Sequence, residues 1–327
     1  MVKLAIISFE HVHAAHYLEV LQRMPEVEIY LAEPDEKRLA SCGKLLEGVT
    51  RFPDYREMLR QTKLDGAIVC SANARHYELV RECARAGVHV LCEKPIATRL
   101  KDAYEMLAVC EAQRVILGIC FPCRHSSVLS QARKILQQGG LGELVAVKST
   151  NHGTMPGGWF ADPTQSGGGA VTDHTVHVVD ALRWFLGVEF TQVMARAATR
   201  LYDIPVEDVG LLSLEMNNQA FVTLDTSWSR PNKSFPIWGD VHLTLVGSKG
   251  VMELELFPWT LNYYSESVGK HLALARDGDL NGKMIRNFVA AIQGKETIAA
   301  SGMDGVRALE VVEAAYRSIA SRAVALI

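Results

Sequence analysis

A lysine between an acid and a proline closes one of the short apolar runs of this chain. The run covers residues 88–92, follows Gly87, and continues directly into Glu93, Lys94 and Pro95. Such a run is typical of a buried parallel strand and its exit turn. Ligands of open α/β sheets bind beyond the carboxyl ends of the strands, and the surroundings of a lysine there can push it toward neutrality or use it as a fixed cation. The alternative is an ordinary solvated loop lysine.

A second stretch combines glycines with acidic and imidazole side chains. Residues 166–169 are a serine and three glycines, and a helical pattern follows them. Asp173, His177 and Asp180 then recur at i, i+4 and i+7, on one face of the predicted helix. A carboxylate one turn from a histidine can orient the imidazole for acid/base work near neutral pH. The alternative is a helix-start carboxylate followed by a core histidine.

The first strand is followed by a loop, residues 7–14, at the place where dinucleotide folds carry a glycine-rich phosphate loop. In the G-x-G-x-x-G register, Ser8, Glu10 and His13 occupy the three glycine positions. Glycines there allow a tight turn and a close approach of the backbone to a pyrophosphate. A carboxylate at Glu10 opposes that anion unless it turns away or is neutralised. This loop alone therefore does not predict a dinucleotide site.

An acid, Glu33, ends the second predicted strand. An acid at this position of a dinucleotide fold holds the ribose 2′-OH of the adenosine and disfavours a 2′-phosphate. Glu33 therefore favours NAD over NADP. The alternative is an ordinary turn acid before Pro34.

Two further groups have metal or redox spacing. Cys120 and Cys123 form a C-x-x-C pair, but no second pair accompanies it, and buried structural thiols are commoner. Histidines also cluster at the first turn, where an acidic or thiol ligand that would complete a set is not evident. They are His11, His13 and His16, with His174 and His177 as further candidates. The sequence therefore predicts no metal site.

The elements that must position these residues change in pattern near residue 122. Before it, strands of about five residues alternate with helical segments, which predicts a doubly wound parallel sheet. These strands are expected at residues 3–7, 27–32, 65–70, 88–92 and 115–119, with a helical segment over 36–46. After it, longer alternating strands predict an α+β domain with a mostly antiparallel sheet. These strands are expected at 144–151, 190–202, 209–216, 220–227, 241–247 and 250–256, with helices at 128–138, 282–293 and 304–325.

Two domains are therefore expected. Residues 1–122 would form a Rossmann-type dinucleotide-binding domain, and residues 123–327 an α+β domain for substrate binding and oligomerisation. The Asn217-Asn218 pair is expected to form the turn of a hairpin.

The composition limits the classes of function. The chain has 327 residues, 48% hydrophobic and 22% charged, with a formal net charge of −3, and no basic run that indicates nucleic acid. No apolar stretch reaches the roughly 18 residues that span a bilayer, and we expect no membrane partner. Seven cysteines, an odd number, do not form a disulfide framework, which favours a cytoplasmic protein.

Several of these features together resemble the Gfo/Idh/MocA oxidoreductases, the family of glucose-fructose oxidoreductase and inositol dehydrogenase. The resemblance is carried by Lys94 in its Glu-Lys-Pro motif, by residues 73–76, and by the glycines at 167–169 that lead to Asp173 and His177. It covers nearly the whole chain.

The resemblance implies hydride transfer between a nicotinamide and a sugar, polyol or related alcohol or ketone. Lys94 would polarise or protonate the substrate oxygen, His177 would act as general acid/base, and Asp173 would orient them. It also implies a homo-oligomer, a dimer or tetramer, and the cofactor NAD, with NADP less favoured. The residues expected along the cofactor are Ser8, Phe9, Glu10, His11, His13, Glu33, Ser71, Asn73, His76, Glu93 and Lys94.

The chain departs from the family pattern at all three loop glycines and at Thr175, where the family usually has glycine, and it adds His174. Alternatives to the dehydrogenase are therefore a nucleotide-binding regulator without turnover, and an NAD-using relative that cleaves glycosides. Substrate specificity would come from side chains of the second domain. The candidates are Arg124, His152, Trp159 and Trp228.

Overall fold

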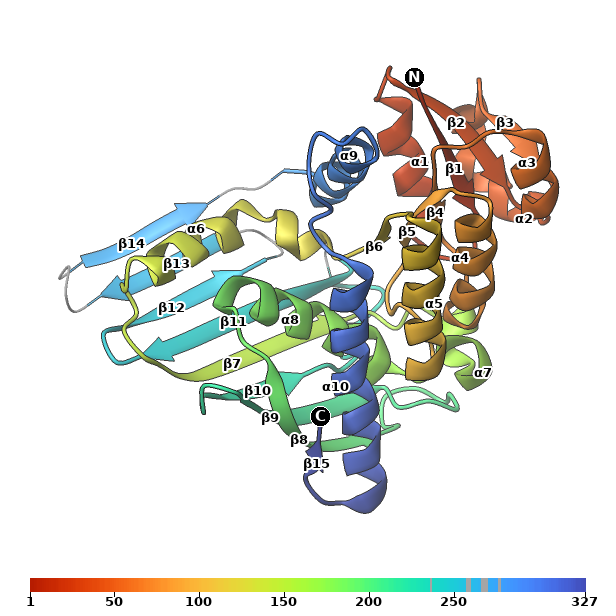
Figure 1. Ribbon diagram of the computed structural model, residues 1–327. Helices are drawn as coiled ribbons and strands as arrows, with labels where there is room; N and C mark the ends of the chain where they lie inside the picture. The colour runs from red at the N-terminus through yellow and green to blue at the C-terminus, as the bar shows by residue number, and fades with distance from the viewer. Residues whose placement is uncertain (236, 257–259, 266–269, 276–277) are drawn as a thin grey trace. The chain divides into compact units, whose positions relative to one another are not determined.

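The computed structural model describes residues 1–235, 237–256, 260–265, 270–275 and 278–327 (Figure 1). The chain divides into two compact units. The first comprises Met1–Phe121 and Asn281–Val306, and the second Pro122–Leu280 and Arg307–Ile327. The first unit thus includes a late segment, which the expected division at residue 122 places in the second domain.

A six-stranded parallel sheet forms the centre of the first unit. Its order is β3-β2-β1-β4-β5-β6, the arrangement of a doubly wound dinucleotide fold. The strands are β1 (Val2–Ile7), β2 (Val27–Ala32), β3 (Thr50–Phe52), β4 (Gly66–Val69), β5 (His89–Cys92) and β6 (Leu117–Ile119). The strands β1, β4 and β5 are almost wholly buried, as expected where both faces of a parallel sheet are covered. This confirms the predicted fold class of the first half.

Helices cover both faces of this sheet. They are α1 (Ala14–Gln22), α2 (Glu36–Leu39), α3 (Tyr55–Gln61), α4 (His76–Arg85), α5 (Leu100–Gln113) and α9 (Leu280–Ile292), with 3₁₀ turns η1 (Ala40–Leu46) and η2 (Asn73–Arg75). α4 packs beside α5 (Figure 1). α9 adds Met284, Ile285 and Phe288 to the core that contains Leu4 and Ile6.

One helix of the first unit is shorter than predicted. The pattern at residues 36–46 predicts a continuous helix, but regular α-helix ends at Leu39 and η1 follows. Gly43 adopts φ 47°, a left-handed conformation that interrupts the helix and that glycine tolerates best. The prediction of one helix was therefore wrong in its second half.

A nine-stranded sheet forms the second unit, in the order β14-β13-β12-β11-β7-β10-β9-β8-β15. The strands are β7 (Leu144–Gly153), β8 (Phe190–Ala198), β9 (Val209–Met216), β10 (Phe221–Asp225), β11 (Gly239–Gly247), β12 (Gly250–Glu255), β13 (Thr260–Ser265), β14 (Lys270–Ala275) and β15 (Ala325–Leu326). β7 and β10 are parallel, and the other neighbours are antiparallel. This confirms the mostly antiparallel sheet.

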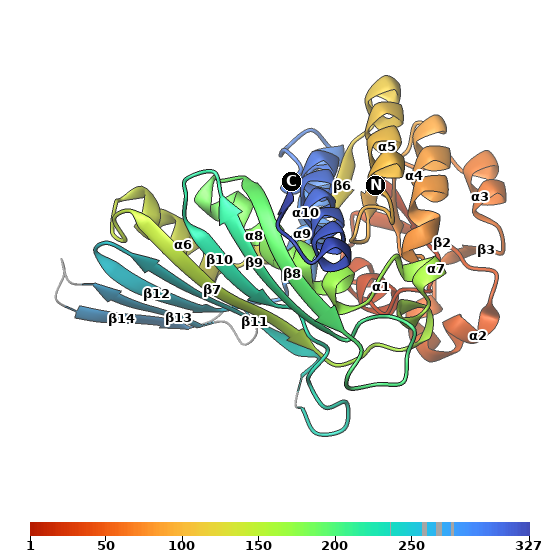
Figure 2. The same cartoon turned by 90° about the horizontal axis from the view of Figure 1, so that it is seen from below.

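The second unit also contains helices, some of which cover one face of its sheet. They are α6 (Ser127–Gln137), α7 (Pro163–Ser166), α8 (Ala170–Leu186) and α10 (Gly302–Ser321), with 3₁₀ turns η3 (Pro122–His125) and η4 (Gly158–Ala161). α6 and α8 contact the strands directly, and Figure 2 shows the sheet from its other side. Alternate residues of β7, such as Val147, Ser149 and Asn151, are buried under these helices.

One strand boundary and the detail of one turn differ from the predictions. β8 ends at Ala198 rather than at residue 202, because the carboxylate of Asp208 accepts hydrogen bonds from the backbone N–H groups of Arg200, Leu201 and Tyr202, each at 2.8 Å. The β9–β10 hairpin forms as expected, but its left-handed residue is Gln219, with φ 66°.

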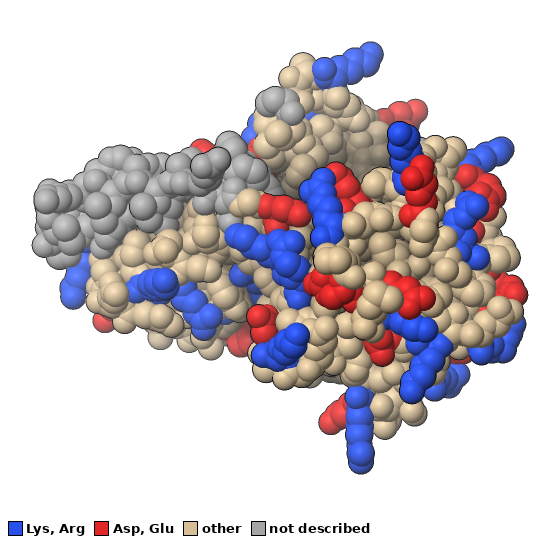
Figure 3. Space-filling model, turned by 90° about the horizontal axis from the view of Figure 1, so that it is seen from above, with Lys and Arg blue, Asp and Glu red and all other residues tan. Residues whose placement is uncertain are grey.

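Charges of both signs are interspersed on the face seen in Figure 3. Within the described residues, no helix combines the length and the hydropathy needed to cross a membrane.

Candidate active site

Lys94 lies directly after β5, at the carboxyl edge of the parallel sheet, and only 5% of it is exposed. Its turn is tied to the exit of β4 by a buried histidine. His76 places Nδ1 2.9 Å from the carbonyl oxygen of Pro95 and Nε2 3.2 Å from that of Ser71. Burial lowers the pKa of His76, so its neutral imidazole donates to one of these carbonyls. Among the residues expected along the cofactor, His76 therefore has a positioning contact to the Lys94 turn.

Glu93 is the centre of a buried cluster under the β1–α1 loop. Its Oε1 accepts a hydrogen bond from the Tyr17 hydroxyl at 2.6 Å and lies 2.9 Å from His13 Nδ1 and 3.6 Å from His11 Nδ1. Burial alone would raise the pKa of Glu93, but His11, His13 and Lys94 hold it well below its usual range. Tyr17 was missed by the sequence reasoning. Its signal is the i, i+4 spacing from His13 on α1.

Glu33 lies at the end of β2, as predicted, and its carboxylate is buried against the same loop. Oε2 accepts hydrogen bonds from the backbone N–H of Phe9 at 2.6 Å and from the Ser8 hydroxyl at 3.3 Å. Oε1 accepts from the backbone N–H of Asp35 at 2.9 Å and from Arg38 at 3.1 Å. Glu33 therefore fixes the β1–α1 loop, in which Ser8 adopts φ 72°.

Glu10 stands at the second glycine position, and two arginines neutralise it. Its carboxylate lies 3.3 Å from Arg75 Nη1 and 3.4 Å from Arg38 Nη2, and it accepts a hydrogen bond from the backbone N–H of Ala72 at 3.0 Å. The unfavourable charge that the sequence places at this loop is thus compensated within the protein.

The residues at the carboxyl edge of the parallel sheet fit NAD, but the loop that would hold its diphosphate differs from the usual glycine-rich loop. The acid at the end of β2 is present, and α1 begins without a side-chain cap on its first turn. However, the backbone N–H groups of Phe9, Glu10 and His13 are bonded to the side chains of Glu33, Ser8 and His11. The cations beside the loop are Arg38 and Arg75, both partly exposed.

Asp173 and His177 lie in the second unit, on α8, whose start is held by Glu207. The Glu207 carboxylate accepts hydrogen bonds from the backbone N–H groups of Gly169 at 2.9 Å and Val171 at 3.1 Å, and from the Tyr316 hydroxyl at 2.7 Å. A Cβ on Gly169 would lie 1.9 Å from the carbonyl oxygen of Glu207. The glycines before α8 therefore permit close packing, and they set the position of the helix.

Asp173 contacts a tryptophan and a histidine. Its Oδ2 accepts a hydrogen bond from Trp228 Nε1 at 3.1 Å and lies 3.3 Å from His174 Nε2. The other ring nitrogen of His174 lies 2.8 Å from the carbonyl oxygen of Thr226. His177 is buried one turn further along α8. The added histidine of the sequence thus takes part in positioning Asp173.

Two of the specificity candidates make strong internal ion pairs. Arg124 donates to both carboxylate oxygens of the buried Asp180, with Nη2 2.6 Å from Oδ1. His152 lies 3.1 Å from Asp225 and 3.3 Å from Asp240. Burial would lower the pKa of His152, but these two carboxylates raise it to about 9. Both side chains are therefore charged and held in place.

The remaining candidates lie as follows. Trp159 stacks on Phe160 at 3.9 Å between ring centroids, and Asn73 is buried in η2. His16 is partly exposed and lies 3.5 Å from Glu19. All seven cysteines are buried and lie outside any disulfide, Cys120 and Cys123 included.

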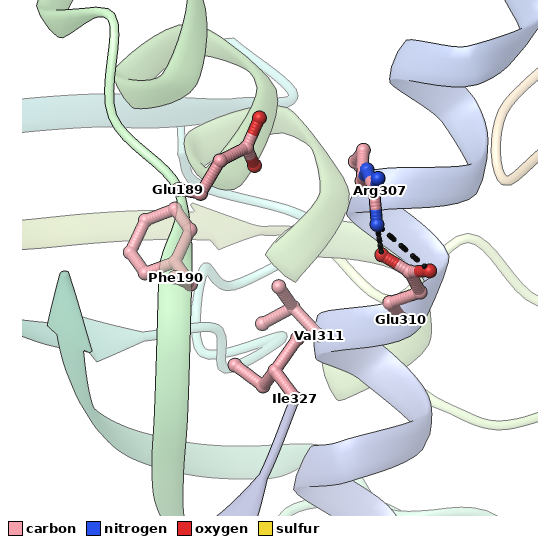
Figure 4. Close-up of a pocket in the computed structure, with 6 residues that line it drawn as sticks. All are labelled: Glu189, Phe190, Arg307, Glu310, Val311 and Ile327. Carbon is pink, nitrogen blue, oxygen red and sulfur yellow. Dashed lines mark hydrogen bonds and ion pairs between the residues drawn. The ribbon is translucent and has the colours of Figure 1, made fainter. Parts of the chain in front are cut away.

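A shallow pocket of the second unit contains none of the predicted site residues. It is lined by Glu189, Phe190, Arg307, Glu310, Val311 and Ile327 (Figure 4). Arg307 and Glu310, one turn apart on α10, pair with each other at 2.9 Å, and Glu189 pairs with Arg183, which is not drawn.

Known proteins resemble this chain over nearly its full length. It is 25% identical to myo-inositol 2-dehydrogenase of Thermotoga maritima over 97% of this chain and 96% of that protein. It is 26% identical to D-glucoside 3-dehydrogenase of Escherichia coli over 94% and 92% of the two chains. The WlbA dehydrogenase of Bordetella pertussis, solved with NADH and UDP-GlcNAcA, shares the fold with a TM-score of 0.87 at 19% identity, covering 100% and 97% of the two chains.

Family models match both halves. Residues 4–121 match the oxidoreductase family with an NAD-binding Rossmann fold, and residues 129–253 match the GFO/IDH/MocA C-terminal domain. The predicted resemblance is confirmed, and the protein belongs to the NAD-binding oxidoreductases of the Gfo/Idh/MocA family.

Proposed function

We propose that this oxidoreductase transfers hydride between NAD and a hydroxyl-bearing carbon of a sugar or polyol. The observation that carries the proposal is the position of Lys94, buried at the carboxyl edge of a sheet whose family binds NAD. The sugar or polyol class is supported by relatives named as inositol and glucoside dehydrogenases. Residues 1–122 would hold the dinucleotide and residues 123–327 the substrate, in a cytoplasmic dimer or tetramer.

The residues proposed for the chemistry act on the substrate oxygen and its proton. Bound NAD would supply the hydride acceptor. Lys94 provides a cation that polarises the oxygen, and His177 accepts the hydroxyl proton during oxidation and returns it during reduction. Asp173, held by Trp228 and His174, orients these groups.

The proposed cofactor contacts come from four strand exits of the parallel sheet. They are Ser8, Phe9, Glu10, His11 and His13 after β1, Glu33 after β2, Ser71, Asn73 and His76 after β4, and Glu93 with Lys94 after β5. Glu33 favours NAD over NADP, because a 2′-phosphate would meet a buried carboxylate.

Turnover of the purified protein with NAD and a panel of inositols and glucosides tests this function. Lys94→Ala and His177→Ala should each lower kcat by roughly 10²–10⁴-fold. NADH affinity of His177→Ala, measured by titration calorimetry, should stay within a few-fold of wild type. The matched control is His125→Ala, a histidine outside the proposed machinery, which should keep wild-type turnover.

Three results would contradict the proposal. Unchanged turnover in both variants would remove the assigned roles. NADH binding without hydride transfer to or from any member of the panel would favour a nucleotide-binding regulator. Glycoside cleavage that accumulates no NADH would point to transient oxidation instead.

A further inference from the structure

We propose that His11, His13 and Glu93 bind a divalent transition-metal ion, with Zn²⁺ as the ion to test. The three side chains come from two strand exits of the first unit, the β1–α1 loop and the turn after β5. One ligand atom from each lies within 4.8 Å of the others. The proposal does not depend on which substrate the enzyme oxidises.

The separations suit a shared ion. His13 Nδ1 lies 2.9 Å and His11 Nδ1 3.6 Å from Glu93 Oε1. Ligand atoms bound at about 2.1 Å in tetrahedral geometry lie roughly 3.4 Å apart. An ion fits between them after small rotations of these side chains, once His11 Nδ1 releases the backbone N–H of His13, which donates to it at 3.3 Å. Two imidazoles and one carboxylate form a ligand set typical of zinc and of non-haem iron.

The burial of the cluster also favours a cation. The Glu93 side chain is fully buried and the His11 side chain is 1% exposed. A buried carboxylate is costly unless it is compensated, and a divalent ion between it and two imidazoles provides the compensation. An ion at this cluster would thus be held by one fully buried carboxylate, one buried imidazole and one partly exposed imidazole.

The cluster of His11, His13 and Glu93 is open to solvent on one side, and hydrogen bonds hold its residues in place. The His13 side chain is 35% exposed, which gives an ion a path from solvent and leaves coordination positions for water or substrate. The Tyr17 hydroxyl donates to Glu93 Oε1 at 2.6 Å, and the backbone N–H of His11 donates to the carbonyl oxygen of Cys70 at 2.9 Å. The Tyr17 bond orients the carboxylate that would bind the ion, and the His11 backbone bond fixes the loop that carries both histidines.

The positions of the two histidines strengthen the inference. His13 stands where a phosphate loop carries its third glycine, and an imidazole cannot reproduce what a glycine does there; His11 lies two residues before it. His16, three residues later, lies outside the cluster and pairs with Glu19. The chain therefore offers a matched histidine that should not bind the ion.

The test uses untagged full-length protein that has been treated with a chelator and freed of NAD. After reloading with excess Zn²⁺ and gel filtration, the zinc content should be one ion per chain, and calorimetry of the metal-free protein with Zn²⁺ should give a single site. His13→Ala and His11→Ala should weaken Zn²⁺ binding by at least tenfold, whereas His16→Ala should keep wild-type affinity. Circular dichroism of the metal-free proteins checks that each variant is folded. If the buried His11→Ala fails to fold, His13→Ala decides.

Cobalt provides a readout that is independent of activity. Wild-type protein with one equivalent of Co²⁺ should show visible ligand-field absorption, and His13→Ala should lose it. The proposal is overturned if wild type binds Zn²⁺ no more tightly than His13→Ala, or if His16→Ala causes the same loss. Either result would leave His11, His13 and Glu93 as a hydrogen-bonded group only.

Discussion

The carboxylate of Glu10 lies 3.3 Å from the guanidinium of Arg75, at the loop position where a dinucleotide fold usually carries glycine. Arg38 approaches the same carboxylate from α2. Two cations, Arg38 and Arg75, therefore lie beside the loop at which a diphosphate would bind. Both already pair with the carboxylate of Glu10.

Removing that internal anion should strengthen cofactor binding. Glu10→Gln releases Arg75, leaves Arg38 paired only with Glu33 and Asp35, and removes a charge that repels a diphosphate. We expect NADH to bind about fivefold more tightly, about 1 kcal/mol, by titration calorimetry at low salt. Glu36→Gln removes an exposed acid that pairs with Arg51 and should change nothing. Weaker NADH binding in Glu10→Gln would show that the bond from Ala72 matters more than the charge.

Glu33 should be essential for stability as well as for cofactor choice. Its carboxylate accepts from four donors, and an amide in Glu33→Gln would turn an N–H₂ group toward some of them. We expect a loss of about 1–3 kcal/mol in the free energy of unfolding, measured with urea. Glu28→Gln, on the same strand but partly exposed, should stay within about 0.5 kcal/mol. Equal urea midpoints for the two variants would refute this prediction.

Gly169 should not tolerate a methyl group. In Gly169→Ala the new Cβ would meet the backbone carbonyl of Glu207, which cannot move aside as a flexible side chain could. We expect a loss of about 3 kcal/mol or more, or failure to fold. Gly278→Ala is the control, because nothing lies within 4 Å of its Cβ position. Similar melting temperatures for the two variants would contradict this prediction.

His152 should make stability depend on pH in the alkaline range. Its pKa in the folded protein, about 9, is above its ordinary value of 6.5, because Asp225 and Asp240 outweigh the effect of burial. The stabilisation is therefore complete below about pH 6.5 and is lost as the pH rises through about 9. Discounted for partial solvent exposure, it is on the order of 2 kcal/mol. Urea unfolding from pH 6 to 10 should show this decline in wild type and a flatter profile in His152→Gln.

The parallel sheet and its exit turn were predictable because their signals are local. Residues 88–95 contain the strand, the acid, the lysine and the proline in direct succession, and the structure forms β5 there. The prediction of a continuous helix at residues 36–46 was wrong. The reason is also local, but it depends on one backbone angle, the φ of Gly43.

The contacts that build the site were less predictable, because they join distant residues. Glu93 contacts His13, which is 80 positions away in the sequence, and Trp228 contacts Asp173, which is 55 positions away. Periodicity places each residue on its element but carries no information about which element it faces. The histidine cluster therefore lacks an evident acidic ligand in the sequence and contains one in the folded unit.

The late segment of the first unit has a consequence for how the protein is made. Met284 and Phe288 belong to the core beside β1, although nearly 280 residues separate them from it in the chain. A ribosome therefore releases the whole six-stranded sheet long before the helix that completes its core is synthesised. During that interval the apolar surface around Leu4 and Ile6 is left without α9, and a chaperone or the nascent chain itself must shield it.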